Sequence, residues 1–232
     1  MNPIYDQVMD SLDSLLREAE IAHGHLCAGQ ILGVRMAMLG CRLLAVDDPR
    51  GKVNRADRKR LVTFVEIDRC ATDAIAVVTG CRLGKRALKF RDWGKMAATF
   101  VDLGRPAFQE FGLEAVAGGR AVRIAARESS KERAQELYPN VEGKNAQQML
   151  AYRELPDDQL FATQWVEVPL HAREMPGYKA GRIACEICGE GVNFDRHVVR
   201  EELVDGAMTR RSLCRSCAAP ELRYYQPLEP MK

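Results

Sequence analysis

The pattern of apolar positions predicts two helices near the start of the chain. Residues 6–22 place apolar side chains at helical spacing and acids on the other face, which indicates an amphipathic helix. Residues 30–44 are apolar around nearly the whole circumference, as expected of a helix at the centre of a core. Gly29, Gly33 and Ala37 recur every four residues and leave a smooth stripe, along which we expect another backbone to pack closely.

Strand and helix patterns follow one another through residue 168. The hydrophobic pattern predicts strands at residues 61–67, 87–91, 96–102, 121–125 and 164–168, and helices at residues 71–79, 106–111, 129–137 and 145–153 and from Asp157. We expect the strands at 87–91 and 96–102 to form a hairpin through residues 92–95.

Residues 169–183 combine Pro176, Gly177 and Gly181 with little periodicity, which is typical of a linker. We therefore expect a core domain over residues 1–168 and a small module over residues 184–232.

The C-terminal module carries two Cys-x-x-Cys pairs, Cys185/Cys188 and Cys214/Cys217, separated by the 25 residues 189–213. Two such pairs can complete a tetrahedron around one Zn²⁺ at about 2.3 Å per bond, and an all-cysteine set favours a closed, structural site. The pattern predicts a zinc finger of the zinc-ribbon or treble-clef type, in preference to two disulfides or an Fe–S cluster. Residues 198–204 are expected to enter a hairpin through residues 205–206.

The composition limits the kinds of partner and the cellular compartment that we expect. The chain has 232 residues, a 47% hydrophobic fraction, a 28% charged fraction and a net charge of +2. This balance does not favour nucleic acid or a membrane surface, and the C-terminal arginines are interspersed with acids. No apolar run approaches the roughly 20 residues of a membrane span, and no signal-peptide pattern is present. We expect a cytoplasmic protein whose thiolates bind metal.

A second reactive cluster lies at the entrance to the buried helix. His23, His25 and Cys27 alternate, so an extended backbone would direct all three to one side. Imidazole and thiolate suit Zn, Fe, Ni or Cu, and the helix N-terminus favours a thiolate at Cys27. Cys70 takes an equivalent place before residues 71–79. The pattern indicates a metal or catalytic site; the alternative is hydrogen-bonded histidines and core thiols.

Several motifs in this region resemble the E-subunit family of formylmethanofuran dehydrogenase. They are HGHLCAG (residues 23–29), GVRMA (33–37), CATDAI (70–75), TGCRLGK (79–85) and DWGK (92–95), in that order. The resemblance covers roughly residues 15–125, and the C-terminal module is similar to an extension that some members carry. One departure is Ala28, where many members have proline, a change to the stiffness of the turn.

The resemblance implies an α+β core with helices packed on a mostly antiparallel sheet, a homodimer, and a His/Cys-lined cavity for a second transition metal. It also implies an association with one-carbon metabolism and with molybdenum- or tungsten-dependent dehydrogenases. The implied metal ligands are His23, His25, Cys27, Cys70 and Cys81. The implied catalytic residues are Cys27, Cys70 and Asp73, where Asp73 orients a ligand or acts as a base, and the residues for an anionic substrate or cofactor group are Lys85 and Lys95.

These observations leave three functional hypotheses. The first is a metal-binding accessory or partner of a one-carbon dehydrogenase system. The second is a small stand-alone enzyme that uses a metal or thiolate at His25, Cys27 and Cys70. The third is a zinc-ribbon binder of nucleic acid or protein, which the balanced charge makes the least favoured.

Overall fold

The computed structural model describes residues 10–53, 55, 59–104, 120–204 and 207–228. It divides into two compact units, Met1–Pro176 and Gly177–Lys232. The helix predicted at residues 106–111 and the turn predicted at residues 205–206 lie outside the described residues, as do residues 6–9 of the first predicted helix.

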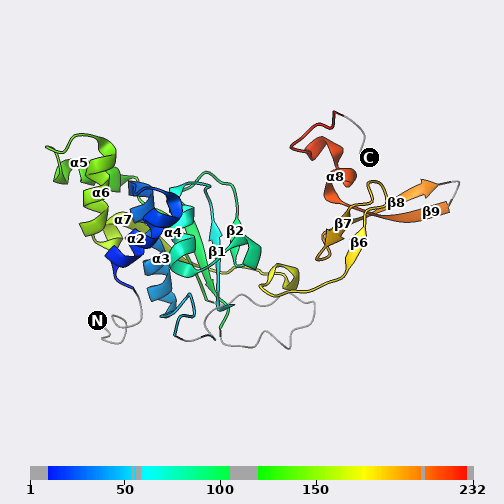
Figure 1. The fold of residues 1–232 in the computed structure, drawn as a ribbon, viewed down its shortest axis with the longest axis horizontal. Coiled ribbons are helices and arrows are strands. Elements are labelled where there is room, and N and C mark those ends of the chain that lie inside the picture. The colour runs from blue at the N-terminus through cyan, green and yellow to red at the C-terminus, as the bar shows by residue number, and fades with distance from the viewer. Residues whose placement is uncertain (1–9, 54, 56–58, 105–119, 205–206, 229–232) are drawn as a thin grey trace. The chain divides into compact units, whose positions relative to one another are not determined.

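A five-stranded sheet forms the centre of the first unit, in the order β2-β1-β3-β4-β5 (Figure 1). β1 and β2 are parallel, and the other neighbours pair antiparallel. The predicted α+β fold with a mostly antiparallel sheet is therefore confirmed. The strands are β1 (Leu61–Val65), β2 (Leu88–Phe90), β3 (Ala97–Asp102), β4 (Ala121–Ala126) and β5 (Phe161–Val166).

The predicted hairpin between residues 87–91 and 96–102 is wrong, because β1 lies between these two strands. Thr63 of β1 is opposite Leu88 in the parallel pair and opposite Phe100 in the antiparallel pair. A helix connects β1 to β2, as a parallel pair requires. The chain then crosses the end of β1, where the Glu66 carbonyl accepts N–H bonds from Trp93 and Lys95, both at 3.1 Å.

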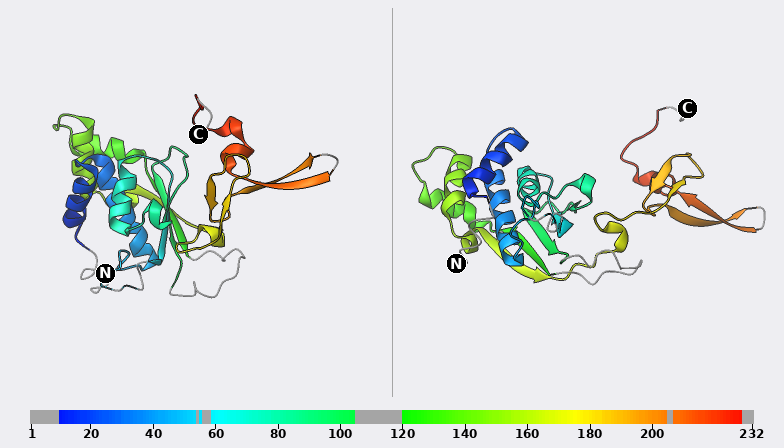
Figure 2. Two further views of the ribbon diagram at one scale, coloured as in Figure 1. Left: turned by 45° about the vertical axis from the view of Figure 1, so that its right-hand side comes forward. Right: turned by 60° about the horizontal axis from the view of Figure 1, so that its bottom comes forward.

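Helices cover one face of this sheet, as the views in Figures 1 and 2 agree. The first begins after Ser11, whose hydroxyl accepts a hydrogen bond from the Ser14 N–H and so caps the helix. The helices are α2 (Leu12–His23), α3 (Ala28–Leu44), α4 (Cys70–Thr79), α5 (Ser129–Leu137), α6 (Lys144–Glu154) and α7 (Asp157–Leu160).

The small-residue stripe of α3 is the surface on which α4 packs. A Cβ atom at Gly33 would lie 2.5 Å from the Ala71 carbonyl oxygen and 2.7 Å from the Ala71 Cα. At Gly29 it would lie 3.2 Å from the Cys70 Cβ. The predicted close approach of another backbone is thus confirmed. It brings the N-terminus of α4 beside the N-terminus of α3.

The two faces of the sheet are covered by different parts of the chain. In β3, Phe100 belongs to the core under the helices, whereas the adjacent Val101 belongs to a second cluster, as the alternation of a strand requires. Leu170 and Met175 complete this second cluster and are buried. The first part of the segment predicted as a linker therefore packs on the sheet.

The described part of the second unit contains two small sheets and a short helix. β8 and β9 pair antiparallel, with Val198 opposite Leu213, so the hairpin predicted from residues 198–204 is confirmed. The buried core of the second unit comprises Cys185, Leu213, Cys214, Cys217 and Ala218. The elements are β6 (Arg182–Ala184), β7 (Gly191–Asn193), β8 (Val198–Val204), β9 (Ala207–Leu213) and α8 (Arg215–Ala218).

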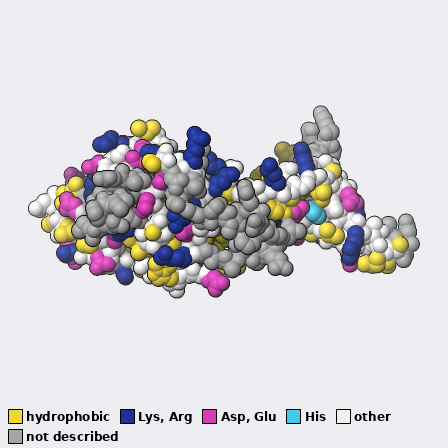
Figure 3. Space-filling view, turned by 90° about the horizontal axis from the view of Figure 1, so that it is seen from below, with side chains coloured by type: hydrophobic (Ala, Val, Ile, Leu, Met, Phe, Trp, Pro, Cys, Tyr) yellow, Lys and Arg dark blue, Asp and Glu magenta, His cyan; other side chains and the backbone are white. Residues whose placement is uncertain are grey.

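The described surface mixes charges of both signs. Figure 3 shows Lys and Arg side chains interspersed with Asp and Glu over the visible face, in keeping with a net charge of +2. Within the described residues, no helix combines the length and apolarity that crossing a membrane requires.

Candidate metal centres

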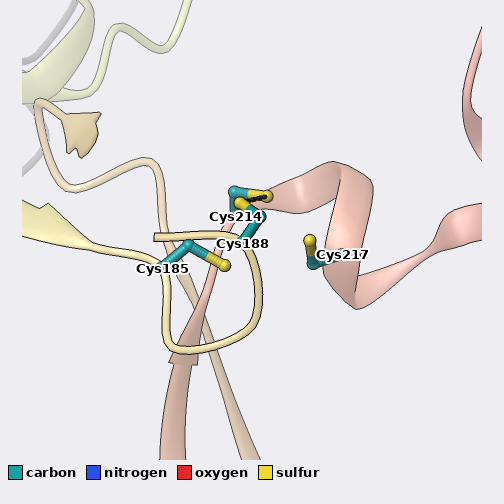
Figure 4. Close-up of side chains that lie close together, drawn as sticks. All are labelled: Cys185, Cys188, Cys214 and Cys217. Atoms are coloured by element: carbon teal, nitrogen blue, oxygen red, sulfur yellow. Dashed lines mark hydrogen bonds between the residues drawn. The ribbon is translucent and has the colours of Figure 1, made fainter. Parts of the chain in front are cut away.

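The four C-terminal cysteines form one cluster, drawn in Figure 4. Their sulfur atoms all lie within 4.8 Å of one another. Cys185 and Cys188 come from the turn between β6 and β7, and Cys214 and Cys217 from the junction of β9 with α8. Each pair is closed by a backbone hydrogen bond, Gly189 N–H to Cys185 O at 2.8 Å and Cys217 N–H to Cys214 O at 3.1 Å.

The electrostatics of this cluster fit a metal ion. Burial opposes ionisation of Cys185, but donors that include the Cys188 and Cys214 backbone N–H groups lower its pKa to about 6. The Glu190 backbone N–H lowers the pKa of Cys188, yet burial and the neighbouring thiols raise it to about 12. The protein alone therefore does not ionise all four thiols together, whereas a divalent cation would. The donor set suits a structural metal.

Three further ligand groups meet where α2 passes into α3. The nitrogen or sulfur donor atoms of His23, His25 and Cys27 lie within 4.8 Å of one another. Helix α2 ends at His23, and Gly24 takes φ +97°, which reverses the chain at little steric cost. Cys27 is the N-cap of α3 in extended conformation, and its thiol makes no capping bond. The local fold thus leaves all three side chains free to converge.

This donor set fits a transition metal with an open position. Two imidazoles and one thiolate around one tetrahedral ion have donor atoms about 3.3–3.8 Å apart, so the observed group needs only small side-chain movements. His23 and Cys27 are half-buried and His25 is exposed. Three protein ligands at an accessible place leave room for water or a substrate atom.

Asp73 fixes the orientation of His23. Asp73 lies in the first turn of α4, and its Oδ2 atom accepts a hydrogen bond from the His23 Nδ1 atom at 2.8 Å. This bond leaves Nε2 as the free ring nitrogen. A carboxylate that accepts from the far nitrogen of a metal-binding histidine sets its tautomer and raises its basicity. The predicted orienting role of Asp73 therefore has a geometric basis.

Replacing Asp73 with asparagine is expected to weaken metal binding at this centre by about 10- to 100-fold, the usual effect of losing such a partner. Competition with a chromogenic chelator measures the affinity. Asp68→Asn is the matched control, because Asp68 lines the same hollow but makes no hydrogen bond to His23. Equal affinities of the wild type and Asp73→Asn would contradict the orienting role.

Cys70 lies beside Cys27 but outside the three-residue group. Burial raises the pKa of Cys70, and the neighbouring Cys27 thiol adds to this rise. The adjacent hollow has a volume of about 390 Å³, and Cys70, Asp73 and His23 line it together with Asp68, Arg69 and Thr72. The thiol of Cys70 is thus placed to protonate or bind a group that enters beside Cys27.

Cys81 is not part of this centre, contrary to the sequence prediction. It follows the C-terminal end of α4, and a ten-residue helix separates its ends by about 15 Å. Its buried sulfur accepts a hydrogen bond from the Thr63 hydroxyl at 3.5 Å. The two lysines predicted to hold an anionic group are also apart: Lys85 lines a different hollow, and Lys95 lies 5.8 Å from the centre of the Trp93 ring.

Two polar residues near the centre were not predicted from the sequence. Asn145 of α6 accepts a hydrogen bond from the Ala28 N–H at 3.3 Å, so it caps α3 in place of Cys27. Asn145 is 117 residues from Ala28 in the sequence, so no local pattern predicted this contact. Gln30 is fully buried and donates to the Cys70 carbonyl at 2.6 Å. A glutamine in a helical segment that is mostly apolar was a usable signal.

Together these features define an α+β protein with a surface His/Cys centre and a separate Cys₄ unit. The chain belongs to the family described as "FmdE, Molybdenum formylmethanofuran dehydrogenase operon", whose model matches residues 22–163. The matched region begins next to His23 and ends before the Cys₄ unit. The resemblance inferred from the motifs is therefore confirmed.

Two individual proteins are also similar to this chain. A tungsten formylmethanofuran dehydrogenase FmdE-like protein from Syntrophus aciditrophicus shares the fold, with a TM-score of 0.55, 16% identity, and coverage of 92% of this chain and 95% of that one. An Archaeoglobus fulgidus protein named "Probable S-adenosyl-L-methionine-binding protein" is 38% identical over 90 residues, 39% of this chain. The chain spans 24% of the length of that curated relative.

Proposed function

We propose that the chain binds a transition metal through His23, His25 and Cys27 and acts as an accessory protein of a molybdenum- or tungsten-dependent one-carbon dehydrogenase system. The observation that carries the proposal is the convergence of three donor atoms within 4.8 Å, with His23 oriented by Asp73. The description of the family, which names a molybdenum formylmethanofuran dehydrogenase operon, supports the association. Zinc in the Cys₄ unit and a homodimeric state are part of the same proposal.

Different residues at this centre bind the ion and orient its ligands. His25, Cys27 and the Nε2 atom of His23 hold the ion, and Asp73 holds His23. A bound ion of this kind supplies Lewis acidity or lowers the pKa of a bound water. Cys70, a neighbour of Cys27, lies beside the remaining position and lines the hollow through which a small ligand would approach.

Metal content tests the proposed centre. The purified chain is expected to hold two ions, and His25→Ala combined with Cys27→Ser is expected to hold one, because the Cys₄ unit keeps its own. Elemental analysis by plasma mass spectrometry gives the count per chain. The matched control is Ala28→Ser, which changes a neighbouring residue without removing a donor atom. One ion per chain in both the wild type and the double variant would contradict the proposal.

The accessory role needs a separate experiment. Affinity purification of the tagged chain from its native cells is expected to recover subunits of a molybdenum- or tungsten-dependent dehydrogenase, and sedimentation of the chain alone is expected to give the mass of a dimer. Recovery of the chain without such subunits, still with two ions, would favour the second hypothesis. The hollow of about 390 Å³ beside the centre favours that alternative, a stand-alone metal- or thiolate-dependent enzyme.

A further inference from the structure

We propose that a second hollow, separate from both metal centres, binds an organic anion. It has a volume of about 420 Å³ and lies between α2 and the segment that follows α4. Ile21, Ala22, Pro49 and Val77 give it apolar walls, and Arg82 and Lys85 give it two cationic groups. Its volume falls within the range of small-molecule sites, about 300–1,000 Å³.

No acidic side chain of the described residues neutralises the positive charge of Arg82 and Lys85. Arg50 also lines the hollow, but its guanidinium is bound to the carboxylates of Glu18 and Asp10. In the described part of the chain, no carboxylate lies within ion-pair distance of Arg82 or Lys85. Glu18 also lines the hollow, but its carboxylate is paired with Arg50 and Lys52. Among the described residues, the hollow therefore offers two cations without an acidic partner next to an apolar surface.

The backbone holds these two cations together. Arg82 precedes a 3-10 helix, Leu83–Lys85, and its carbonyl accepts N–H bonds from Lys85 at 3.2 Å, Ala87 at 3.3 Å and Leu88 at 3.2 Å. Arg82 and Lys85 are thus fixed at the two ends of one turn, and both line the hollow. Burial raises the pKa of Cys81, and the charges of Lys85 and Arg82 both act against this rise, so the two positive potentials reach one buried atom.

The chemistry of the hollow defines its ligand. Guanidinium and ammonium groups bind phosphate and carboxylate oxygens with charge-assisted hydrogen bonds. The apolar walls favour a hydrocarbon or aromatic body, and Ile21 leaves 83% of its surface exposed there. The expected ligand is a phosphate monoester or carboxylate with an apolar group. A bare inorganic anion would use only the cationic side.

The position of the hollow links it to the His/Cys centre without depending on that centre. Ala22 immediately precedes His23, and Val77 lies one turn, about 6 Å along the axis, beyond Asp73 on α4. A ligand that binds here would lie next to the helical turns that carry His23 and Asp73. The site requires no metal, so its test is independent of the proposed function.

Isothermal titration calorimetry of the full chain tests the site. The three probes are phenyl phosphate, benzoate and inorganic phosphate. Phenyl phosphate or benzoate is expected to bind at least about fivefold more tightly than inorganic phosphate, and more weakly as salt is raised. Whichever of the two organic anions binds with the higher affinity identifies the ligand class as a phosphate ester or a carboxylate. The double variant Arg82→Gln/Lys85→Gln is expected to bind at least about tenfold more weakly, a loss of about 1.4 kcal/mol or more.

Lys131→Gln is the control, because it removes an exposed lysine that pairs with Glu128 and does not line the hollow. It is expected to bind the probes as the wild type does. Three results would overturn the proposal: no binding of either organic anion at about 10 mM, equal losses of affinity in Lys131→Gln and the double variant, or equal affinity for inorganic phosphate and both organic anions. Metal content measured on the same double variant is expected to stay at the wild-type value, so a failure here is distinct from a failure of the metal centre.

Discussion

Replacing Cys214 with serine is expected to unfold the second unit and to leave the first unit folded. The buried core of the second unit comprises three of the four cysteines, Leu213 and Ala218, so few apolar contacts remain without an ion. Structural zinc contributes roughly 10–16 kcal/mol of apparent binding free energy to small domains of this kind, and that free energy is folding free energy. A unit this small has no comparable reserve in its hydrophobic core.

Amide hydrogen exchange resolved by residue tests this expectation. In Cys214→Ser, the amides of β8 and β9 are expected to lose protection, while those of β3 and β4 keep it. The metal chelator EDTA at raised temperature is expected to have the same effect on the wild type. Met208→Ser is the matched control, since Met208 is 66% exposed on the same hairpin and holds no ion. Full protection of β8 and β9 in Cys214→Ser would show that the ion is not what folds this unit.

Replacing Gly33 with valine is expected to destabilise the first unit by about 3 kcal/mol, the upper end of the usual cost of overpacking, because the clash is with backbone atoms. The new Cβ would lie 2.5 Å from the Ala71 carbonyl oxygen and 2.7 Å from the Ala71 Cα, which are backbone atoms. The helices α3 and α4 would have to separate. Such separation would also move Cys70 away from Cys27.

Thermal unfolding followed by circular dichroism measures the effect. A loss of about 3 kcal/mol corresponds to a fall in Tm of about 6–12 °C for a domain of this size. Gly84→Val is the control, since a Cβ at Gly84 meets no atom within 4 Å. A Tm for Gly33→Val within about 2 °C of the control would mean that α3 and α4 do not pack as described.

Features encoded by local spacing were predictable from the sequence. The glycine stripe of α3 identified a close contact before its partner, α4, was known. The His-x-His-x-Cys motif identified three donor groups because a chain reversal at Gly24 and an extended Cys27 need only local backbone geometry. The two Cys-x-x-Cys pairs identified the C-terminal cluster for the same reason.

Features that depend on distant pairing were not predictable. Nothing in residues 87–102 shows that β1 lies between β2 and β3, since that order depends on where α4 returns the chain. The motif order suggested Cys81 as a ligand, whereas the length of α4 places it at the other end. Asn145 reaches Ala28 from 117 residues away, a separation that no local pattern records.

His23, His25 and Cys27 are expected to hold a metal ion together. The most direct measurement is a crystal structure of the full chain grown with zinc, with anomalous difference maps recorded on both sides of the zinc absorption edge. We predict two anomalous peaks per chain, one among the four C-terminal cysteines and one about 2.0–2.3 Å from donor atoms of His23, His25 and Cys27, with Asp73 on the far nitrogen of His23. A single peak at the cysteine cluster, with both histidines free of metal, would contradict the account.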